Sequence, residues 1–107
     1  MDMFNSDSCN INGMTGSTKW TWDEYFKNKE KIEKSGGKIY LLDMINHPIK
    51  GSTPISNEIF ENQPDGTYFV LYCHSGGSSG YVQKQLTPQL PQHHIINMAG
   101  GIGMYTG

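Results

Sequence analysis

The chain has 107 residues and a formal net charge of −2, so it is long enough for one small domain with a real core and too short for two. The lack of a basic excess argues against a nucleic-acid partner, and the lack of an acidic block argues against a disordered acidic tail. The longest apolar run is about five residues, far below the ~20 that a membrane helix needs, so we expect no membrane partner.

The first twenty residues lack a basic n-region and an apolar h-region, and therefore do not predict a secretory signal. Cys9 lies in a polar, Gly- and Ser-rich lead, whereas Cys73 ends an apolar run, so the two do not indicate a disulfide framework. We therefore expect a reducing, cytoplasmic location. Cys9 is interpreted as an incidental thiol rather than a resolving one.

We interpret residues 1–18 as a flexible lead and residues 19–107 as the domain. Trp20 to Lys34 is predicted to be a helix, with Thr21 as N-cap and Glu24 closing a capping box. Trp20 and Tyr25 are placed for a hydrophobic staple. An apolar stripe follows at roughly helical spacing and is expected to face the core: Trp22, Tyr25, Phe26 and Ile32.

Lys38 to Met44 is predicted to be a short strand that carries Asp43 near its end. Two prolines and a glycine indicate that Asn46 to Ser56 is loop. Asn57 to Asn62 is expected to form one or two helical turns, and Pro64 to Gly66 a turn.

Thr67 to Tyr72 is the strongest strand signal, and its apolar and aromatic side chains predict burial on both faces. A helix is expected from Ser79 to about Leu86, ending near Thr87 and Pro88. His94 to Met98 is predicted to be a strand, and Ala99 to Tyr105 a Gly-rich turn. Helices that alternate with short buried strands predict an α/β domain, with a mostly parallel central sheet flanked by helices.

The stretch Y-C-H-S-G-G-S-S-G-Y, residues 72–81, places a thiol between a strand and a helix. A Gly- and Ser-rich loop at a helix N-terminus can turn several backbone N–H groups toward one anion. Such a cradle favours a thiolate at Cys73 and makes it a nucleophile. The alternative is a buried structural cysteine at the end of a core strand. The predicted binding loop comprises His74, Ser75, Gly76, Gly77, Ser78 and Ser79.

From Trp20 to Tyr105 the chain resembles a single-domain rhodanese, a sulfurtransferase. Asp43 stands at the family's strand-end aspartate, and G-S-T-P-I-S at 51–56 fills the slot usually written Gly-His-Ile-Pro-Gly-Ala. Cys73 matches the nucleophile. Gly100-Gly101-Ile102 matches the Gly-Gly-Ile/Phe turn, and Tyr105 takes the place usually held by Trp. The chain departs from the pattern in having Ile45, His74 and Ser78 where the family often has arginine, because all eight of its basic residues are lysine.

The resemblance implies transfer of a sulfane sulfur from thiosulfate or a persulfide donor to a thiol or cyanide acceptor, through a persulfide on Cys73. It implies no metal and no organic cofactor. The missing arginines leave an alternative open: a catalytically weak rhodanese-like module that carries sulfur for a partner protein or only binds proteins. Phosphatase activity is rejected, because that chemistry needs a loop-end arginine and Ser79 stands at its position.

Several side chains admit two interpretations. The Ser78 and Ser79 hydroxyls either bind the persulfide or cap the following helix. Asp43 is expected to accept hydrogen bonds from loop N–H groups rather than act as an acid or base. His74 and the His93-His94 pair are expected to be solvated, and no further ligand predicts a metal site at the pair. The glycines at 100, 101 and 103 lack the Gly-Lys-Ser/Thr of a nucleotide loop.

Overall fold

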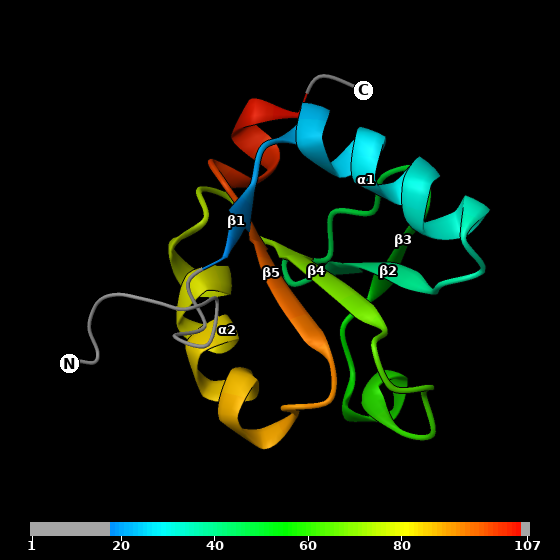
Figure 1. The fold of residues 1–107 in the computed structure, drawn as a ribbon. Helices are drawn as coiled ribbons and strands as arrows, with labels where there is room; N and C mark the ends of the chain where they lie inside the picture. The colour runs from blue at the N-terminus through cyan, green and yellow to red at the C-terminus, as the bar shows by residue number, and fades with distance from the viewer. Residues whose placement is uncertain (1–17, 106–107) are drawn as a thin grey trace, which may run out of the picture.

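The computed structural model describes residues 18–105, which form an α/β domain around one parallel sheet (Figure 1). In chain order its elements are β1 (Lys19–Trp20), α1 (Trp22–Lys34), β2 (Ile39–Asp43), β3 (Ser52–Pro54), η2 (Asn57–Phe60), β4 (Tyr68–Tyr72), α2 (Gly77–Gln89), β5 (His94–Met98) and η3 (Gly101–Met104). The strand order is β1-β5-β4-β2-β3, and each neighbouring pair is parallel. The predicted fold class is confirmed.

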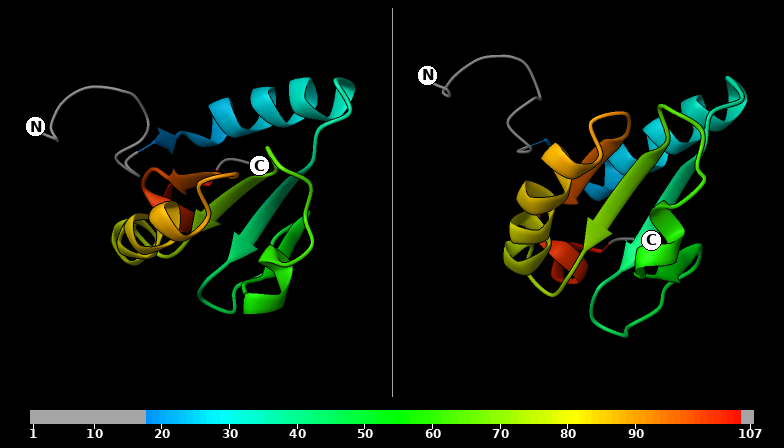
Figure 2. Two further views of the ribbon diagram at one scale, coloured as in Figure 1. Left: turned by 60° about the horizontal axis from the view of Figure 1, so that its bottom comes forward. Right: turned by 90° about the horizontal axis from the view of Figure 1, so that it is seen from below.

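The sheet lies between two layers. Helix α1 covers one face, and α2 with the short 3₁₀-helix η2 covers the other (Figure 2). Residues along the central strands alternate between these layers, as the two-residue period of a strand requires. Leu41, Val70 and Ile96 pack in the cluster with α1, whereas Leu42, Leu71 and Ile95 pack in the cluster beside α2.

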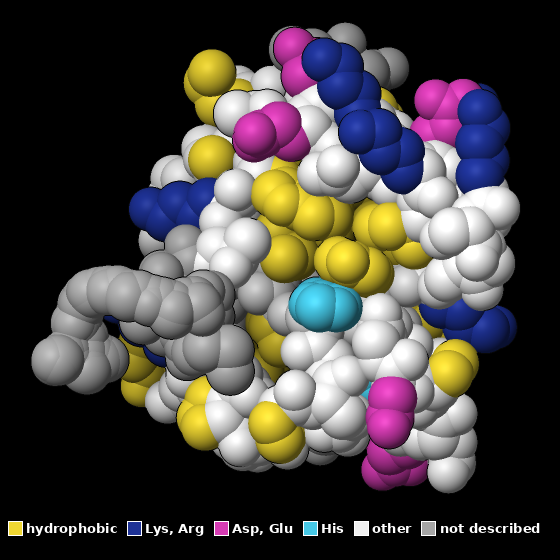
Figure 3. Space-filling model, in the orientation of Figure 1, with side chains coloured by type: hydrophobic (Ala, Val, Ile, Leu, Met, Phe, Trp, Pro, Cys, Tyr) yellow, Lys and Arg dark blue, Asp and Glu magenta, His cyan; other side chains and the backbone are white. Residues whose placement is uncertain are grey.

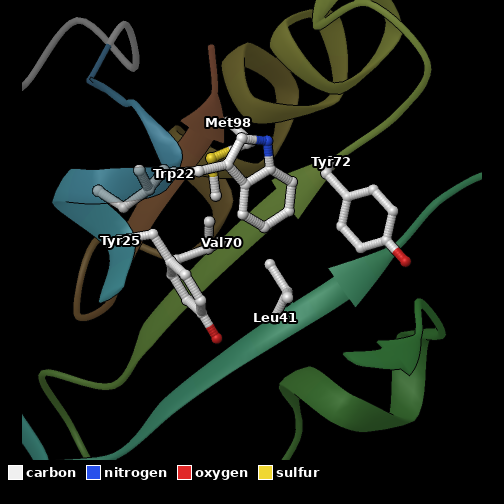
Figure 4. Close-up of a cluster of buried hydrophobic side chains, with 7 residues drawn as sticks. Trp22, Tyr25, Leu41, Val70, Tyr72 and Met98 are labelled. Atoms are coloured by element: carbon white, nitrogen blue, oxygen red, sulfur yellow. The ribbon is translucent and has the colours of Figure 1, made fainter. Parts of the chain in front are cut away.

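The core beneath α1 is rich in aromatic side chains (Figure 4). Trp22 and Tyr25 project from the helix onto the sheet and are each 3% exposed. Trp22 contacts the ring of Tyr72, with centroids 6.0 Å apart, and the ring of Tyr105 at 4.7 Å. This packing joins α1 to the end of β4, immediately before Cys73.

The capping box of α1 is confirmed. The Thr21 hydroxyl accepts from the Glu24 N–H at 3.2 Å, and the Glu24 carboxylate accepts from the Thr21 N–H at 2.8 Å. The predicted helix start at Trp20 is wrong, because Trp20 belongs to β1 and pairs with Met98. Within the predicted apolar stripe, Phe26 remains 42% exposed, since it lies at the margin of the core.

Strand β3 lies inside the segment that the prolines had indicated as loop, so that prediction is corrected. Ser52–Pro54 pairs with β2 at the edge of the sheet. Proline lacks an N–H to donate, but an edge strand has one side without a partner strand, so Pro54 is tolerated there. The backbone oxygen of Asp43 accepts from the Ile55 N–H just beyond it at 3.0 Å.

The predicted helical turn after this strand is present as η2, and its Ile59 and Phe60 pack against the α2-side core. The predicted turn at Pro64–Gly66 leads into β4. Burial of β4 on both faces is confirmed, since Phe69, Val70 and Leu71 are all 0% exposed.

Helix α2 is longer than predicted at both ends. It begins at Gly77 rather than Ser79, and it continues past Pro88 to Gln89. Gly76, with φ 97°, turns the chain into the helix. Pro88 lies in the last turn, where the Thr87 hydroxyl donates to the Gln83 carbonyl at 2.7 Å. The predicted β5 is confirmed, and part of the predicted Gly-rich turn forms the 3₁₀-helix η3.

The predicted lead lies outside the described residues except for Thr18, whose carbonyl accepts from the Asn97 N–H at 3.0 Å. Among the helices of residues 18–105, none has the length and apolar character required to cross a bilayer.

Hydrophobic side chains gather at the surface below α1 (Figure 3). Trp20, Ile39 and Tyr68 are half-buried and pack against the α1-side core.

Candidate active site

Cys73 lies at the carboxyl-terminal edge of the sheet, one residue beyond β4. Because the strands are parallel, the same edge receives the end of β2 and the end of β5. Asp43 pairs with Tyr72 in the register of β2 and β4, and Met98 ends β5 nearby. The fold therefore collects the predicted strand-end residues at the side where parallel α/β sheets usually bind ligands.

The loop after Cys73 turns its backbone N–H groups toward the sulfur. The Gly76 N–H donates to Cys73 Sγ at 3.1 Å, and the Ser79 N–H donates at 3.4 Å. The turn needs the left-handed backbone of Gly76, where a Cβ would also press on the Met98 carbonyl and the Gly100 N–H at 3.3 Å. The predicted anion cradle is present in outline, with Cys73 only 3% exposed.

Two opposing effects act on the pKa of the Cys73 thiol. Burial raises it, because a thiolate loses solvation inside the protein. Hydrogen bonds that the Ser79 hydroxyl and the N–H groups of Ser79, Gly76 and Ser75 can donate to the ionised sulfur lower it, and together they prevail. The pKa of Cys73 therefore lies below its ordinary value of 9.0, which favours the nucleophilic thiolate.

The Gly-Gly turn holds the backbone at Cys73 from the other side. The Ile102 N–H donates to the Cys73 carbonyl at 2.8 Å, and the Gly103 N–H donates to the His74 carbonyl at 3.2 Å. Gly101 has φ 59°, and a Cβ there would overlap the Cys73 carbonyl oxygen. The Trp22 indole N–H then donates to the Gly101 carbonyl at 2.9 Å, which ties the turn to α1.

Ser79 and Asn97 form a buried polar pair beside the sulfur. Ser79 is 0% exposed, and its Oγ lies 3.3 Å from Cys73 Sγ and within hydrogen-bonding distance of Asn97 Oδ1. Asn97 Nδ2 donates to the Gly76 carbonyl at 3.1 Å, so Asn97 is bonded to both the loop and α2. The sequence interpretation missed Asn97. The available signal was a polar residue in the otherwise apolar run of β5.

These contacts argue against the helix-capping interpretation of Ser79. Its hydroxyl bonds Cys73 and Asn97 rather than a backbone group of the α2 N-terminus, and the N-cap residue Gly76 has no side chain. Ser78 is exposed at the surface of the same turn.

The remaining loop positions line the surface around the sulfur. His74, Ser75 and Gly77 are exposed, as the prediction of a solvated His74 requires. Asp43 is 4% exposed, and its Oδ1 accepts from the Ile45 N–H at 2.8 Å. The carboxylate thus shapes the turn after β2, in agreement with the expected hydrogen bonding to loop N–H groups.

The predicted solvated histidine pair is half wrong. His94 is exposed and stacks on Tyr68 with ring centroids 4.2 Å apart, but His93 is only 8% exposed and contacts the edge of Phe69. Alternation along the chain sends one ring outward and the other into the α2-side core. Within residues 18–105 no group of three His, Cys, Asp or Glu side chains is placed to hold a metal ion.

In chemical terms, the site offers one buried free thiol that accepts from neutral hydrogen-bond donors. Comparison with models of known protein families, with curated proteins and with solved structures found no match.

Proposed function

We propose that the chain is a rhodanese-type sulfurtransferase that moves a sulfane sulfur through a persulfide on Cys73. The observation that carries the proposal is the pair of N–H groups, from Gly76 and Ser79, directed at Cys73 Sγ. Fixed dipoles of this kind stabilise an anionic sulfur without a metal or cofactor. They suit a thiolate at Cys73 Sγ, the group that starts the reaction.

The reaction has two displacement steps. The Cys73 thiolate attacks the outer sulfur of thiosulfate, a new S–S bond forms, and sulfite leaves with the electron pair of the old S–S bond. A persulfide donor would react in the same way and release its thiolate. Cyanide or a thiolate acceptor then attacks the outer sulfur of the Cys73 persulfide, and the Cys73 thiolate leaves, ready for the next cycle.

The charge around the cradle bears on which donor is used. The chain has no arginine, and its exposed loop side chains are His74, Ser75 and Ser78. A doubly charged donor such as thiosulfate thus meets no guanidinium there. This favours a persulfide donor, presented by a small thiol or a partner protein. A free thiol that works as a nucleophile requires reducing conditions, so we propose a cytoplasmic site of action.

The lack of arginine around the cradle also favours a second candidate function. This is a sulfur carrier that accepts sulfur on Cys73 but turns over poorly. Thiocyanate formation from cyanide, with thiosulfate or a small-thiol persulfide as donor, separates the two functions when it is measured together with the Cys73 persulfide by mass spectrometry. Catalytic turnover that is lost in Cys73→Ser and kept in Cys9→Ser supports the enzyme. A persulfide without turnover supports the carrier. No persulfide with either thiosulfate or a small-thiol persulfide contradicts both.

A further inference from the structure

The orientation of the Asn97 amide is fixed by the Gly76 carbonyl. That carbonyl can only accept a hydrogen bond, so the atom of Asn97 that faces it at 3.1 Å is the donor Nδ2. The other atom, Oδ1, therefore faces the Ser79 hydroxyl. A reversed amide would set two acceptors against each other at Gly76.

This orientation decides where the Ser79 proton lies. Asn97 Oδ1 can only accept, so the Ser79 hydroxyl donates its single proton to it. Having no second proton, Ser79 Oγ can only accept from Cys73, 3.3 Å away. The arrangement is therefore a chain in which the Cys73 thiol donates to Ser79 and Ser79 donates to Asn97. It fits a protonated sulfur and does not fit a thiolate, which has no proton to give.

We propose that Asn97 is a positioning residue for Cys73. By accepting the Ser79 proton, Asn97 holds the Ser79 hydroxyl in the orientation that accepts from the Cys73 thiol. The bond between Ser79 and Asn97 breaks when the sulfur becomes an anion. The Cys73 proton then passes to solvent. The Ser79 O–H keeps its own proton and turns from Asn97 Oδ1 toward Sγ. The N–H groups of Gly76 and Ser79 bond the sulfur in both states.

The inference concerns the Cys73 thiolate on which the proposed function rests, but it requires no sulfur transfer. Ionisation of Cys73 breaks the hydrogen bond from Ser79 to Asn97, so the presence of Asn97 opposes ionisation of the thiol. Without Asn97, the Ser79 hydroxyl has the sulfur as its remaining partner and donates to the thiolate throughout. The pKa of Cys73 would then fall further.

Few other titratable side chains belong to the elements around Cys73. The loop contributes His74, and β2 contributes Asp43 opposite Tyr72 in the register. Strand β1 contributes Lys19, which pairs with Asn97 in the register and is exposed. The first turns of α2, the end of β5 and η3 carry no ionisable side chain besides Tyr81. Tyr81 is 65% exposed, and its hydroxyl accepts from Gln85 at 2.9 Å.

Gly80 keeps the space that Asn97 occupies. A Cβ at Gly80 would lie 3.1 Å from Asn97 Nδ2, closer than ordinary packing allows. The absence of a side chain at Gly80 thus leaves room for the Asn97 amide between α2 and β5.

The test is the pH dependence of Cys73 alkylation by iodoacetamide, measured in a Cys9→Ser background so that a single thiol reacts. Asn97→Leu has nearly the same shape but cannot accept the Ser79 proton. We expect its Cys73 pKa to fall by roughly one unit, about tenfold in ionisation constant, since one hydrogen bond to a charged group is gained. A merely structural role for Asn97 predicts the opposite, because loss of the Gly76 contact would loosen the N–H donors and raise the pKa.

Two further variants make the result specific. In Ser79→Ala the pKa is expected to rise, and adding Asn97→Leu to it should produce no fall. Gln83→Met is the matched control, because Gln83 also joins α2 to β5, donating to the Ile95 carbonyl at 2.9 Å, and makes no hydrogen bond to Cys73. Its pKa for Cys73 should equal that of the parent.

A fall in Asn97→Leu that disappears in the Ser79→Ala background supports the proposal. An unchanged or raised pKa in a folded Asn97→Leu protein overturns it. If Asn97→Leu does not fold, Ser79→Ala decides alone, and an unchanged Cys73 pKa in that variant overturns the proposal. A protein that shows these shifts but forms no persulfide would refute the proposed function and leave the role of Asn97 standing.

Discussion

At the scale of single residues, the candidate site depends on backbone donors more than on side chains. Cys73 is the one side chain of the site that carries chemistry, while Gly76 and Gly101 allow the chain to fold tightly on either side of it. The side chains of His74, Ser75 and Ser78 are exposed. Substitutions that change the backbone path should therefore have larger effects than changes of exposed loop side chains.

The first prediction concerns the Cys73 thiol. Its pKa is lowered in the folded protein, so the thiolate persists at pH values somewhat below the ordinary 9.0 and is protonated only further down. The rate of iodoacetamide alkylation at Cys73 should accordingly reach half its maximum below pH 9.0 in the native protein. The same chain in denaturant is the control, and there the midpoint should return to the ordinary value. Coincident midpoints would show that the cradle does not favour the thiolate.

The second prediction concerns Gly101. In Gly101→Ala the new methyl group must displace the Cys73 carbonyl, and the residue is also strained at φ 59°. We expect a loss of about 3 kcal/mol in the free energy of unfolding, measured with denaturant. Gly36→Ala is the matched control, because Gly36 has φ 86° and open space around it. It should lose only about 1 kcal/mol. Equal losses would mean that the turn does not press on Cys73.

At the scale of elements, the ends of helices are set by local hydrogen bonds. Thr21→Ala removes the hydroxyl that caps α1 and should lower the free energy of unfolding by about 1 kcal/mol. Ser56→Ala is the comparison, because Ser56 precedes η2 without a side-chain capping bond. It should stay within about 0.5 kcal/mol of the parent. Similar effects in the two variants would contradict the role given to the capping box.

The elements that the sequence predicts well are those whose signals are local. The capping box fixes the start of α1 at Trp22, and the apolar runs locate β2, β4 and β5. Strand β3 was missed because Pro54 is a strong local signal against a strand, while its pairing at a sheet edge is a property of the tertiary structure.

The residues of the candidate site also differ in whether a local sequence signal reveals them. Cys73 and its glycine-rich loop are visible in the sequence, because a strand, small residues and a helix follow one another directly. Asn97 is distant along the chain, and it reaches Ser79 only because β5 lies beside β4 under α2. His93 was misjudged for a related reason, since strand alternation decides which histidine is buried only once the covering layer is known.

At the scale of the whole molecule, acid should destabilise the fold partly through His94. Although His94 is exposed, its ring stacks on Tyr68 and is partly shielded from water, and this desolvation, with the neighbouring His93, lowers the pKa of His94 below 6.5. As the pH falls through 6.5, the unfolded chain binds a proton before the folded chain does. Stability is therefore lost between pH 6.5 and the lower folded pKa, and is unaffected by this group at higher pH. In His94→Gln, denaturant unfolding should depend less steeply on pH in that range, and an unchanged slope would contradict the assignment.

The elements around the candidate site meet at the carboxyl-terminal edge of the sheet. The parallel strands β2, β4 and β5 end on the same side, α1 is tied to that side through Trp22, and η3 supports the Cys73 backbone there. We propose that this edge holds a reactive sulfur at Cys73.

The most direct measurement is the mass of the protein after incubation with thiosulfate or a small-thiol persulfide, followed by peptide mapping. We expect a gain equal to one sulfur atom on the peptide that contains Cys73. The gain should be reversed by cyanide, absent from Cys73→Ser and present in Cys9→Ser. No gain with either donor, or a gain that persists in Cys73→Ser, would contradict the proposed role of Cys73.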